Sequence, residues 1–241
     1  MRTIRCHVDA PLSVGATATL SETATGHLVR VLRLGVGDAV VLFNGDGHDY
    51  DARLVATGKR GAEAEVTGAR ALANESPLAI TLAQGVARGE KMDLVLQKGT
   101  ELGVAAFAPI NTERTEVKLD AERAAKRLAH WQGVLVAACE QSGRARVPSL
   151  ASPLALAQWA GGAHAGLKLM LDPEGELTLA SLPAADAVPL VVGPEGGLSE
   201  RDLATLRAAG FKGLRLGPRI LRTETAGLAA IAALQSRLGD L

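Results

Sequence analysis

The 241-residue sequence has few aromatic residues, which make up only 2% of it, and few cysteines, of which there are two. With so few large rings, the core must be built mainly from Leu, Val and Ala, and an apolar content of 47% is sufficient for one. Cys6 and Cys139 lie far apart and lack metal-ligand spacing. This pattern argues against a disulfide framework and favours a reducing compartment, so we expect a cytoplasmic protein.

The sequence also lacks an excess of charge of either sign. Lys plus Arg and Asp plus Glu each number 26, so the formal net charge is +0. A general nucleic-acid binder usually carries a basic excess, so any basic surface here has to be local. No apolar run approaches the roughly 20 residues of a membrane span, and the N-terminus lacks the apolar region of a signal peptide. We therefore expect no membrane partner.

Residues 1–71 have the pattern of a small β-rich module. Within 38–57, two β-rich stretches flank the turn cluster GDGHD, and this arrangement predicts a hairpin. Before the hairpin, Leu28, Val31 and Leu32 recur at helical spacing. They predict one short helix with these three side chains on a shared apolar face.

The pattern changes after a linker at 71–77. Short apolar runs then alternate with stretches of helical periodicity, which is typical of βαβ units around a parallel sheet. The expected strands are 78–85, 104–110, 166–171, 187–193 and 213–217, and the expected helices are 91–103, 120–143, 198–210 and 222–239.

Two of the expected strands end in the same kind of turn. The segments VVGPEGG (191–197) and LRLGPRILRTE (214–224) each run from a strand through Gly and Pro into irregular chain. Ligands of open parallel sheets bind beyond the carboxyl ends of the strands, and glycine allows them close to the backbone. One such turn more often merely ends a strand, but two in the same half of the sheet favour a pocket. We expect Ser199, with Asp202, to cap the helix that follows the first turn.

Several known site signatures are absent. The sequence has no G-x-x-x-x-G-K-[ST], no G-x-G-x-x-G after a first strand, no G-x-S-x-G and no H-E-x-x-H. These absences argue against a P-loop hydrolase and against the usual dinucleotide fold. The five histidines are scattered, so we expect no metal site.

Basic side chains gather in two segments of the second half. Arg144 and Arg146 follow the long expected helix that carries Glu140, and a second basic group lies within 212–224. Guanidinium groups suit phosphates and nucleobase edges, although a solvated face explains such a run equally well. A local basic patch on a neutral protein would confine anion binding to one surface.

Six segments, in their order along the chain, resemble the RsmE family, the uridine-N3 methyltransferases of small-subunit ribosomal RNA in the SPOUT superfamily. The resemblance covers nearly the whole chain, and the ordered set is more specific than any one segment. The segments are HLVRVLRLGVGD, GEKMDLVLQKGTELGV, TERTEV, ACEQSGR, GPEGGLS and LGPRILRTETA.

The resemblance implies a PUA-like β-barrel for RNA binding at 1–71 and an α/β methyltransferase domain with a deep trefoil knot at 72–241. It also implies a homodimer that uses S-adenosylmethionine, held in the knot by three loops. Matched to this sequence, the implied cofactor-binding residues are Leu171, Val192, Gly193, Pro194, Gly197, Leu216, Gly217, Ile220, Leu221, Thr225 and Ala226.

Methylation of uridine N3 requires that the nitrogen lose its proton. A cation near the carbonyl oxygens of the base would stabilise the anion, and Arg144 and Arg222 are the catalytic candidates by position and type. Glu195, and after it Glu140, is the candidate carboxylate to take the proton. The structural alternatives are that Glu195 holds a turn and that Glu140 pairs with Arg144.

Ribosomal RNA, free or in the assembled small subunit, is the implied partner. With so few aromatic residues, base stacking contributes little, and the shape of folded RNA is the expected basis of recognition. Two alternatives stay open: a non-catalytic ribosome-assembly protein that binds RNA, and a knotted methyltransferase acting on another nucleoside or on a ribose 2′-hydroxyl. The expected phosphate contacts are Arg2, Arg5, Arg30 and Arg33, with Lys91, Lys98 and Arg114 from the second domain.

Overall fold

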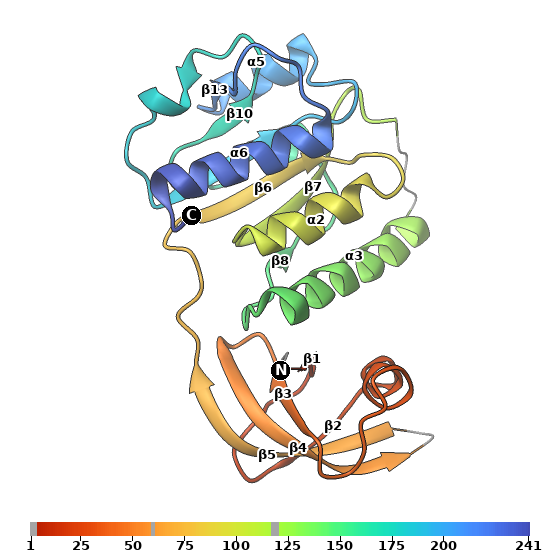
Figure 1. The fold of residues 1–241 in the computed structure, drawn as a ribbon. Helices are drawn as coiled ribbons and strands as arrows, with labels where there is room; N and C mark the ends of the chain where they lie inside the picture. The colour runs from red at the N-terminus through yellow and green to blue at the C-terminus, as the bar shows by residue number, and fades with distance from the viewer. Residues whose placement is uncertain (1–3, 59–60, 117–120) are drawn as a thin grey trace. The chain divides into compact units, whose positions relative to one another are not determined.

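The computed structural model describes residues 4–58, 61–116 and 121–241, shown as a ribbon in Figure 1. The chain separates into two units, each built on its own sheet. In the part of the chain that is described, no helix combines the length and apolar character needed to cross a membrane. The first unit comprises Met1–Glu75 and Val136–Val147, and the second comprises Ser76–Leu135 and Pro148–Leu241.

The first unit contains a five-stranded sheet. Its middle is the predicted hairpin, in which Val41 pairs with Asp51 and Leu42 with Tyr50. Successive side chains of a strand point to opposite faces, so one face of the sheet covers an apolar core that includes Leu42 and Leu54. In spatial order the strands are β1 (Arg5–His7), β3 (Ala39–Phe43), β4 (His48–Gly58), β5 (Gly61–Ala71) and β2 (Thr17–Thr19), and the β1–β3 pair is parallel while the others are antiparallel.

The short helix of the first unit differs from its prediction. A four-residue α1 (Glu22–Thr25) continues into a π-helix, η1 (Gly26–Val31). Leu28 is fully buried, but Val31 is 67% exposed and Leu32 is 38% exposed, so the predicted apolar face is wrong for these two. The backbone bonds of a π-helix join residues five apart, which changes the angular spacing on which the prediction rested.

The second unit contains a sheet in which every strand pair among the described residues is parallel, as the alternation of strands and helices predicted. The strands in the middle of the sheet are mostly buried because helices cover both faces, whereas the short strands at its edges are partly exposed. In spatial order the strands are β11 (Leu177–Thr178), β13 (Lys212–Arg215), β10 (Leu169–Leu171), β12 (Ala187–Val192), β6 (Ala79–Gly85), β7 (Ala106–Asn111) and β8 (Ser149–Leu150), and β9 (Leu154–Ala155) also pairs with β7.

Helices lie on both faces of this sheet. Ala83 and Val191 join a core cluster with residues of α4 and α5, whereas the next residue along each strand, Gln84 and Val192, faces α6. This two-residue alternation sorts the side chains between the layers. Figure 1 shows α2 and α6 together beside β6, and these two helices are in contact. The helices are α2 (Lys91–Glu101), α4 (Leu156–Ala160), α5 (Glu200–Ala208) and α6 (Thr223–Leu238), with a 3₁₀ turn, η2 (Leu179–Ser181).

The long helix α3 (Ala121–Ser142) runs from the second unit into the first. It ends at Gly143, whose φ of +83° is the left-handed conformation that commonly stops a helix. The end of α3 belongs with the first unit because Cys139 packs in one cluster with Phe43 and Ala145. The sequence-based division after residue 71 does not include this return of the chain, since the contacts that define it are long-range.

The ends of β6 and β12 approach each other at a glycine. A Cβ atom placed on Gly85 would lie 2.5 Å from the backbone nitrogen of Pro194 and 2.6 Å from its Cδ. Real Cβ atoms do not come so close, so any larger residue here must push away the turn that follows β12. Gly85 therefore fixes the position of that turn against the sheet.

We predict that Gly85→Ala lowers the free energy of unfolding by about 1–3 kcal/mol, because the added methyl group overpacks a buried contact. Urea denaturation measures this. The matched control is Gly133→Ala, an exposed position within α3 with open space around its Cα. There the same change should leave stability equal or raise it by up to about 1 kcal/mol. Equal stability of Gly85→Ala and the native protein would contradict the packing argument.

Candidate functional site

A cavity of about 470 Å³ lies at the carboxyl ends of β10, β12 and β13, where the first turn of α6 begins. Its volume is in the range of pockets that enclose small organic ligands. Both predicted Gly-Pro turns contribute to its wall. The lining residues are Lys91, Arg114, Leu171, Asp172, Pro173, Val192, Gly193, Pro194, Glu195, Gly196, Gly197, Leu198, Leu203, Leu214, Leu216, Gly217, Arg219, Ile220, Leu221, Arg222, Thr223, Glu224 and Ala226.

The wall combines aliphatic side chains with uncovered backbone. Gly217 has a φ of +135°, and no atom lies within 4 Å of the position that a Cβ would take there. A side chain at this point would be strained and would enter open space beside the cavity. Aliphatic walls with accessible backbone N–H and C=O groups suit a flat, polar-edged ligand such as a nucleoside.

The cavity brings together nearly all the residues proposed for the cofactor. Of that set only Thr225 does not line it. Thr225 is exposed, because it lies on the outer side of α6, while its neighbours Glu224 and Ala226 reach the cavity. Two of the three catalytic candidates, Glu195 and Arg222, also line it.

A buried polar cluster lies behind the cavity wall and joins three segments of the second unit. The Thr223 hydroxyl donates to the Gly193 carbonyl at 2.6 Å and accepts from Gln84 Nε2 at 2.8 Å. Gln84 Nε2 also lies 3.4 Å from the same carbonyl. Gln84 is 1% exposed and Thr223 is 7% exposed, so water does not replace these bonds. Sequence reasoning missed Gln84 because it stands in an apolar run without any motif.

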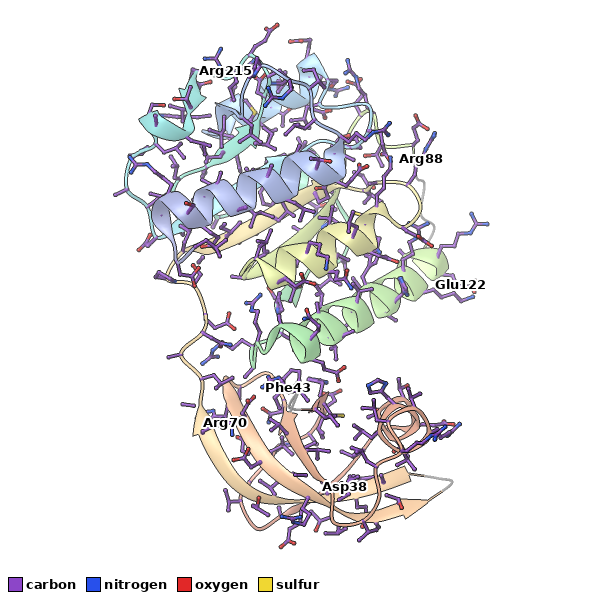
Figure 2. All side chains as sticks on the ribbon, in the orientation of Figure 1. Asp38, Phe43, Arg70, Arg88, Glu122 and Arg215 are labelled. Atoms are coloured by element: carbon purple, nitrogen blue, oxygen red, sulfur yellow. The ribbon has the colours of Figure 1, made fainter. Side chains whose placement is uncertain are left out.

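Glu195 ties the turn after β12 to the chain around the start of α2. Glu195 Oε1 accepts from Lys91 Nζ at 2.9 Å and from the backbone N–H of Arg88 at 3.0 Å. Burial opposes the charge of this carboxyl, but the hydrogen bonds from Lys91 and Arg88 outweigh it and lower its pKa. Arg88 lies in the loop between β6 and α2 (Figure 2). These contacts correspond to the alternative in which Glu195 keeps a turn in shape.

The N-terminal end of α5 follows the same turn. Ser199 Oγ accepts from the backbone N–H of Asp202 at 3.1 Å, and Asp202 Oδ2 accepts from the backbone N–H of Ser199 at 3.0 Å. This is the reciprocal cap that the sequence predicted. It directs the chain from the cavity wall straight into α5.

Arg144 does not line the cavity; it lies in the first unit. Its side chain is 6% exposed and forms a two-point ion pair with Glu75, in which Nε donates to Oε1 at 3.1 Å. Glu140, the alternative partner, instead accepts from the backbone N–H of His7 at 3.0 Å. Arg144 thus belongs to another unit than Glu195 and Arg222, and its role in the reaction stays a prediction.

The proposed RNA contacts fall into separate groups. The Arg5 guanidinium is 8% exposed, pairs with Asp49 and donates to the Arg144 carbonyl at 3.0 Å, and its contact with RNA stays a prediction. Arg30 and Arg33 are exposed on that unit, while Lys98 pairs with Glu101 at 2.8 Å. Lys91 and Arg114 line the cavity of the second unit, and Arg2 lies outside the described residues.

The histidines do not form a metal site in the part of the chain that is described. No group of three or more His, Cys, Asp or Glu side chains there could hold a metal ion. His130, for example, lies 2.7 Å from Asp93 on the surface, without a third ligand.

Comparison with known families defines the class of protein. Residues 74–235 match the family described as RNA methyltransferase domain, and residues 20–67 match the family described as RNA methyltransferase PUA domain. The first match contains all the residues that line the cavity. The chain is therefore an RNA methyltransferase with a PUA domain.

Relatives over the whole chain narrow the class to one family. The ribosomal RNA small subunit methyltransferases E of Buchnera aphidicola subsp. Schizaphis graminum and of Bacillus subtilis are 31% and 32% identical, over 98% and 90% of this chain and 97% and 89% of their own lengths. The solved structure of ribosomal RNA small subunit methyltransferase E from Neisseria gonorrhoeae, bound to S-adenosylmethionine, is 40% identical, with a TM-score of 0.93 and complete coverage of both chains. A methyltransferase of Legionella pneumophila in complex with the same cofactor is also 40% identical over both complete chains, with a TM-score of 0.97. This chain belongs to the ribosomal RNA small subunit methyltransferase E family.

We predict that Thr223→Val lowers the free energy of unfolding by about 1–3 kcal/mol, because it leaves a buried carbonyl and a buried amide without their hydroxyl partner. The control is Thr205→Val, which removes a solvent-accessible hydroxyl bond within α5 and should change stability by less than about 0.5 kcal/mol. Chemical denaturation compares the two. Similar small losses at both positions would show that the buried cluster contributes little.

We predict a pH-dependent loss of stability in Glu195→Gln. A carboxyl whose pKa is lower in the folded state stabilises the fold above its unfolded pKa, near 4.5, and this contribution disappears as pH falls through the folded pKa. The difference in unfolding free energy between native and variant protein should be largest near pH 7 and shrink below pH 4.5. Introducing Glu195→Gln into a Lys91→Met background should reduce the effect. A difference that does not change with pH would contradict the assignment.

Proposed function

We propose that this protein transfers a methyl group from S-adenosylmethionine to N3 of a uridine in small-subunit ribosomal RNA. The observation that carries the proposal is the cavity at the ends of β10, β12 and β13, which lies within a chain of this family and is walled by both Gly-Pro turns. A non-catalytic RNA-binding protein would not need a shaped small-molecule cavity beside its RNA surface.

The residues of the cavity fit the proposed cofactor. The aliphatic side chains of Leu171 and Val192 offer flat contact for the adenosine part, and the backbone at Gly217 offers hydrogen-bonding groups. When bound, S-adenosylmethionine supplies a methyl group on a positively charged sulfur. The contribution of the protein is to hold the reactants in order and to exclude water from them.

The basic groups at the cavity support the proposal for the uridine. Arg222 and Arg219 are exposed, and both line the cavity. A guanidinium beside the carbonyl oxygens of uridine favours the form of the base that has lost its N3 proton. Arg222 directly precedes Thr223, so the buried cluster positions its backbone. We assign Arg222 to stabilisation of the uridine anion.

For Glu195 we propose a positioning role. Its carboxylate already accepts two hydrogen bonds, and its lowered pKa makes it a weak proton acceptor near neutral pH. By tying the turn after β12 to the start of α2, it keeps one wall of the cavity in place. Arg144 is paired with Glu75 in the first unit, and we leave it outside the proposed roles at the cavity.

The first unit is the proposed docking module for RNA. Arg30 and Arg33 are exposed at the end of η1, and Val31 and Leu32 are exposed between them. Guanidinium groups contact phosphates and set the orientation of the RNA, while the base pocket lies in the second unit. Both cysteines are free and buried, which supports a reducing cytoplasmic location.

We also infer that the second unit contains the SPOUT trefoil knot and that two copies of the chain form a dimer. The support for the knot is the strand order, in which β13 lies between β11 and β10 although it is formed after both. Chain 173–176 also crosses very close to β13, since a Cβ on Gly175 would lie 2.5 Å from the backbone of Gly213. Such threading is rare in proteins. The dimer rests on the family resemblance alone.

The test is transfer of a labelled methyl group to small ribosomal subunits that lack the modification, followed by nucleoside digestion and mass spectrometry. We expect N3-methyluridine as the product. Methylation of another nucleoside or of a ribose 2′-hydroxyl would favour the alternative of a knotted methyltransferase with a different target. Absence of both transfer and cofactor binding in calorimetry would favour an RNA-binding assembly protein.

A donor-site variant sharpens the test. Gly217→Val strains the backbone of the cavity wall, and we expect loss of cofactor binding and of methyl transfer. The matched control is Gly15→Val, which has a similar positive φ of +86° and open surroundings in the first unit. It should keep both properties. Full activity of Gly217→Val would show that the donor binds elsewhere.

A further inference from the structure

Glu224 has an unusual position in the cavity wall. It is the second residue of α6 and lines the cavity beside Arg222. Its Oε2 is buried, and among the described residues it has no hydrogen-bond partner. A carboxylate oxygen that has neither a protein partner nor contact with water is costly, and a ligand bound beside Glu224 could supply the missing partner.

The other carboxylates of the wall already have partners. Asp172 accepts from the guanidinium of Arg207 at 3.0 Å and from the backbone N–H of Glu174 at 2.9 Å. Glu195 accepts from Lys91 and from the backbone N–H of Arg88. Both carboxylates stabilise the protein itself, whereas Oε2 of Glu224 has no hydrogen-bond partner among the described residues.

Glu224 lies in the first turn of α6, one residue past Thr223. Arg222 is two positions before Glu224, and its exposed guanidinium makes no ion pair with Glu224 within the described chain. The cavity thus has an anionic acceptor, and a cationic ligand group is the chemistry that matches it.

We propose that Glu224 is a specificity residue that binds a positively charged group of the methyl donor. The inference rests on the proposed function, because it takes S-adenosylmethionine as the ligand. That molecule carries two positive groups, the sulfonium and the α-ammonium, and either would pair with this carboxylate. Pairing with the sulfonium has a further consequence: the charge disappears when the methyl group leaves, so Glu224 would favour donor over product in the cavity.

The test is calorimetric titration of the native protein and of Glu224→Gln with S-adenosylmethionine and with the uncharged-sulfur product S-adenosylhomocysteine. We expect Glu224→Gln to bind the donor at least about tenfold more weakly, the usual scale for a charge-assisted bond in a cavity. An equal loss for donor and product assigns the ammonium group, and a loss for the donor alone assigns the sulfonium. Both results support the proposal.

Two controls separate this role from others. Glu200→Gln removes an exposed carboxylate from the first turn of α5, outside the cavity, and should bind both ligands normally. Glu224→Gln without ligand should be as stable as the native protein, because Oε2 makes no hydrogen bond within the described chain that the change would remove. A marked loss of stability without ligand would overturn the proposal in favour of a structural role.

Two further outcomes would also overturn it. Donor binding unchanged in Glu224→Gln, with turnover lost, would make Glu224 a proton acceptor for the uridine instead. Donor binding and turnover both unchanged would leave Glu224 without any role in the site. If the native protein itself binds no S-adenosylmethionine, the proposed function fails, and this inference fails with it.

Discussion

The site depends on one buried hydrogen-bonded cluster, formed by Gln84, Thr223 and the carbonyl of Gly193. Each member comes from a different segment: the end of β6, the turn after β12 and the start of α6. Since water cannot replace these bonds, losing the hydroxyl or the Gln84 Nε2 donor would leave buried groups without a partner and lower stability. The two walls of the cavity belong to two of these segments. Their separation is therefore set by a hydroxyl group and an amide behind them, not by the ligand.

Much of the fold could be predicted from the sequence, because its signals are local. Continuous apolar runs mark the parallel strands, Gly143 stops α3, and the Ser199 cap begins α5. The two Gly-Pro turns indicated the cavity for the same reason, since the ends of parallel strands meet at one edge of a sheet. The buried cluster could not be predicted in this way. Its bonds join residues 109 and 139 positions apart, and Gln84 is a single polar residue in an apolar run.

The partners of the charged residues were the least predictable part of the structure. The local sequence around Arg5 and Arg144 is typical of surface arginines. Yet Arg5 is buried against an acid 44 positions away, and Arg144 against one 69 positions away. A guanidinium is equally suited to a phosphate and to a carboxylate, so its residue type does not identify its partner. The predicted burial of Val31 and Leu32 was wrong for a different reason: a π-helix replaces the α-helical spacing.

The charges of the cavity differ with depth, and this arrangement explains how a protein of zero net charge can serve a cationic donor and a polyanionic substrate together. The acceptor oxygen of Glu224 is buried, and Asp172 is 6% exposed, whereas Arg219 and Arg222 are exposed. A uniformly basic cavity would repel the donor, and a uniformly acidic surface would repel RNA. Salt in the solvent screens exposed charges, so each charge acts mainly on groups close to it. The deeper carboxylates can therefore attract the cationic donor while the exposed guanidinium groups attract RNA. Neutral composition is therefore compatible with RNA methylation when the few unpaired charges are placed in this order.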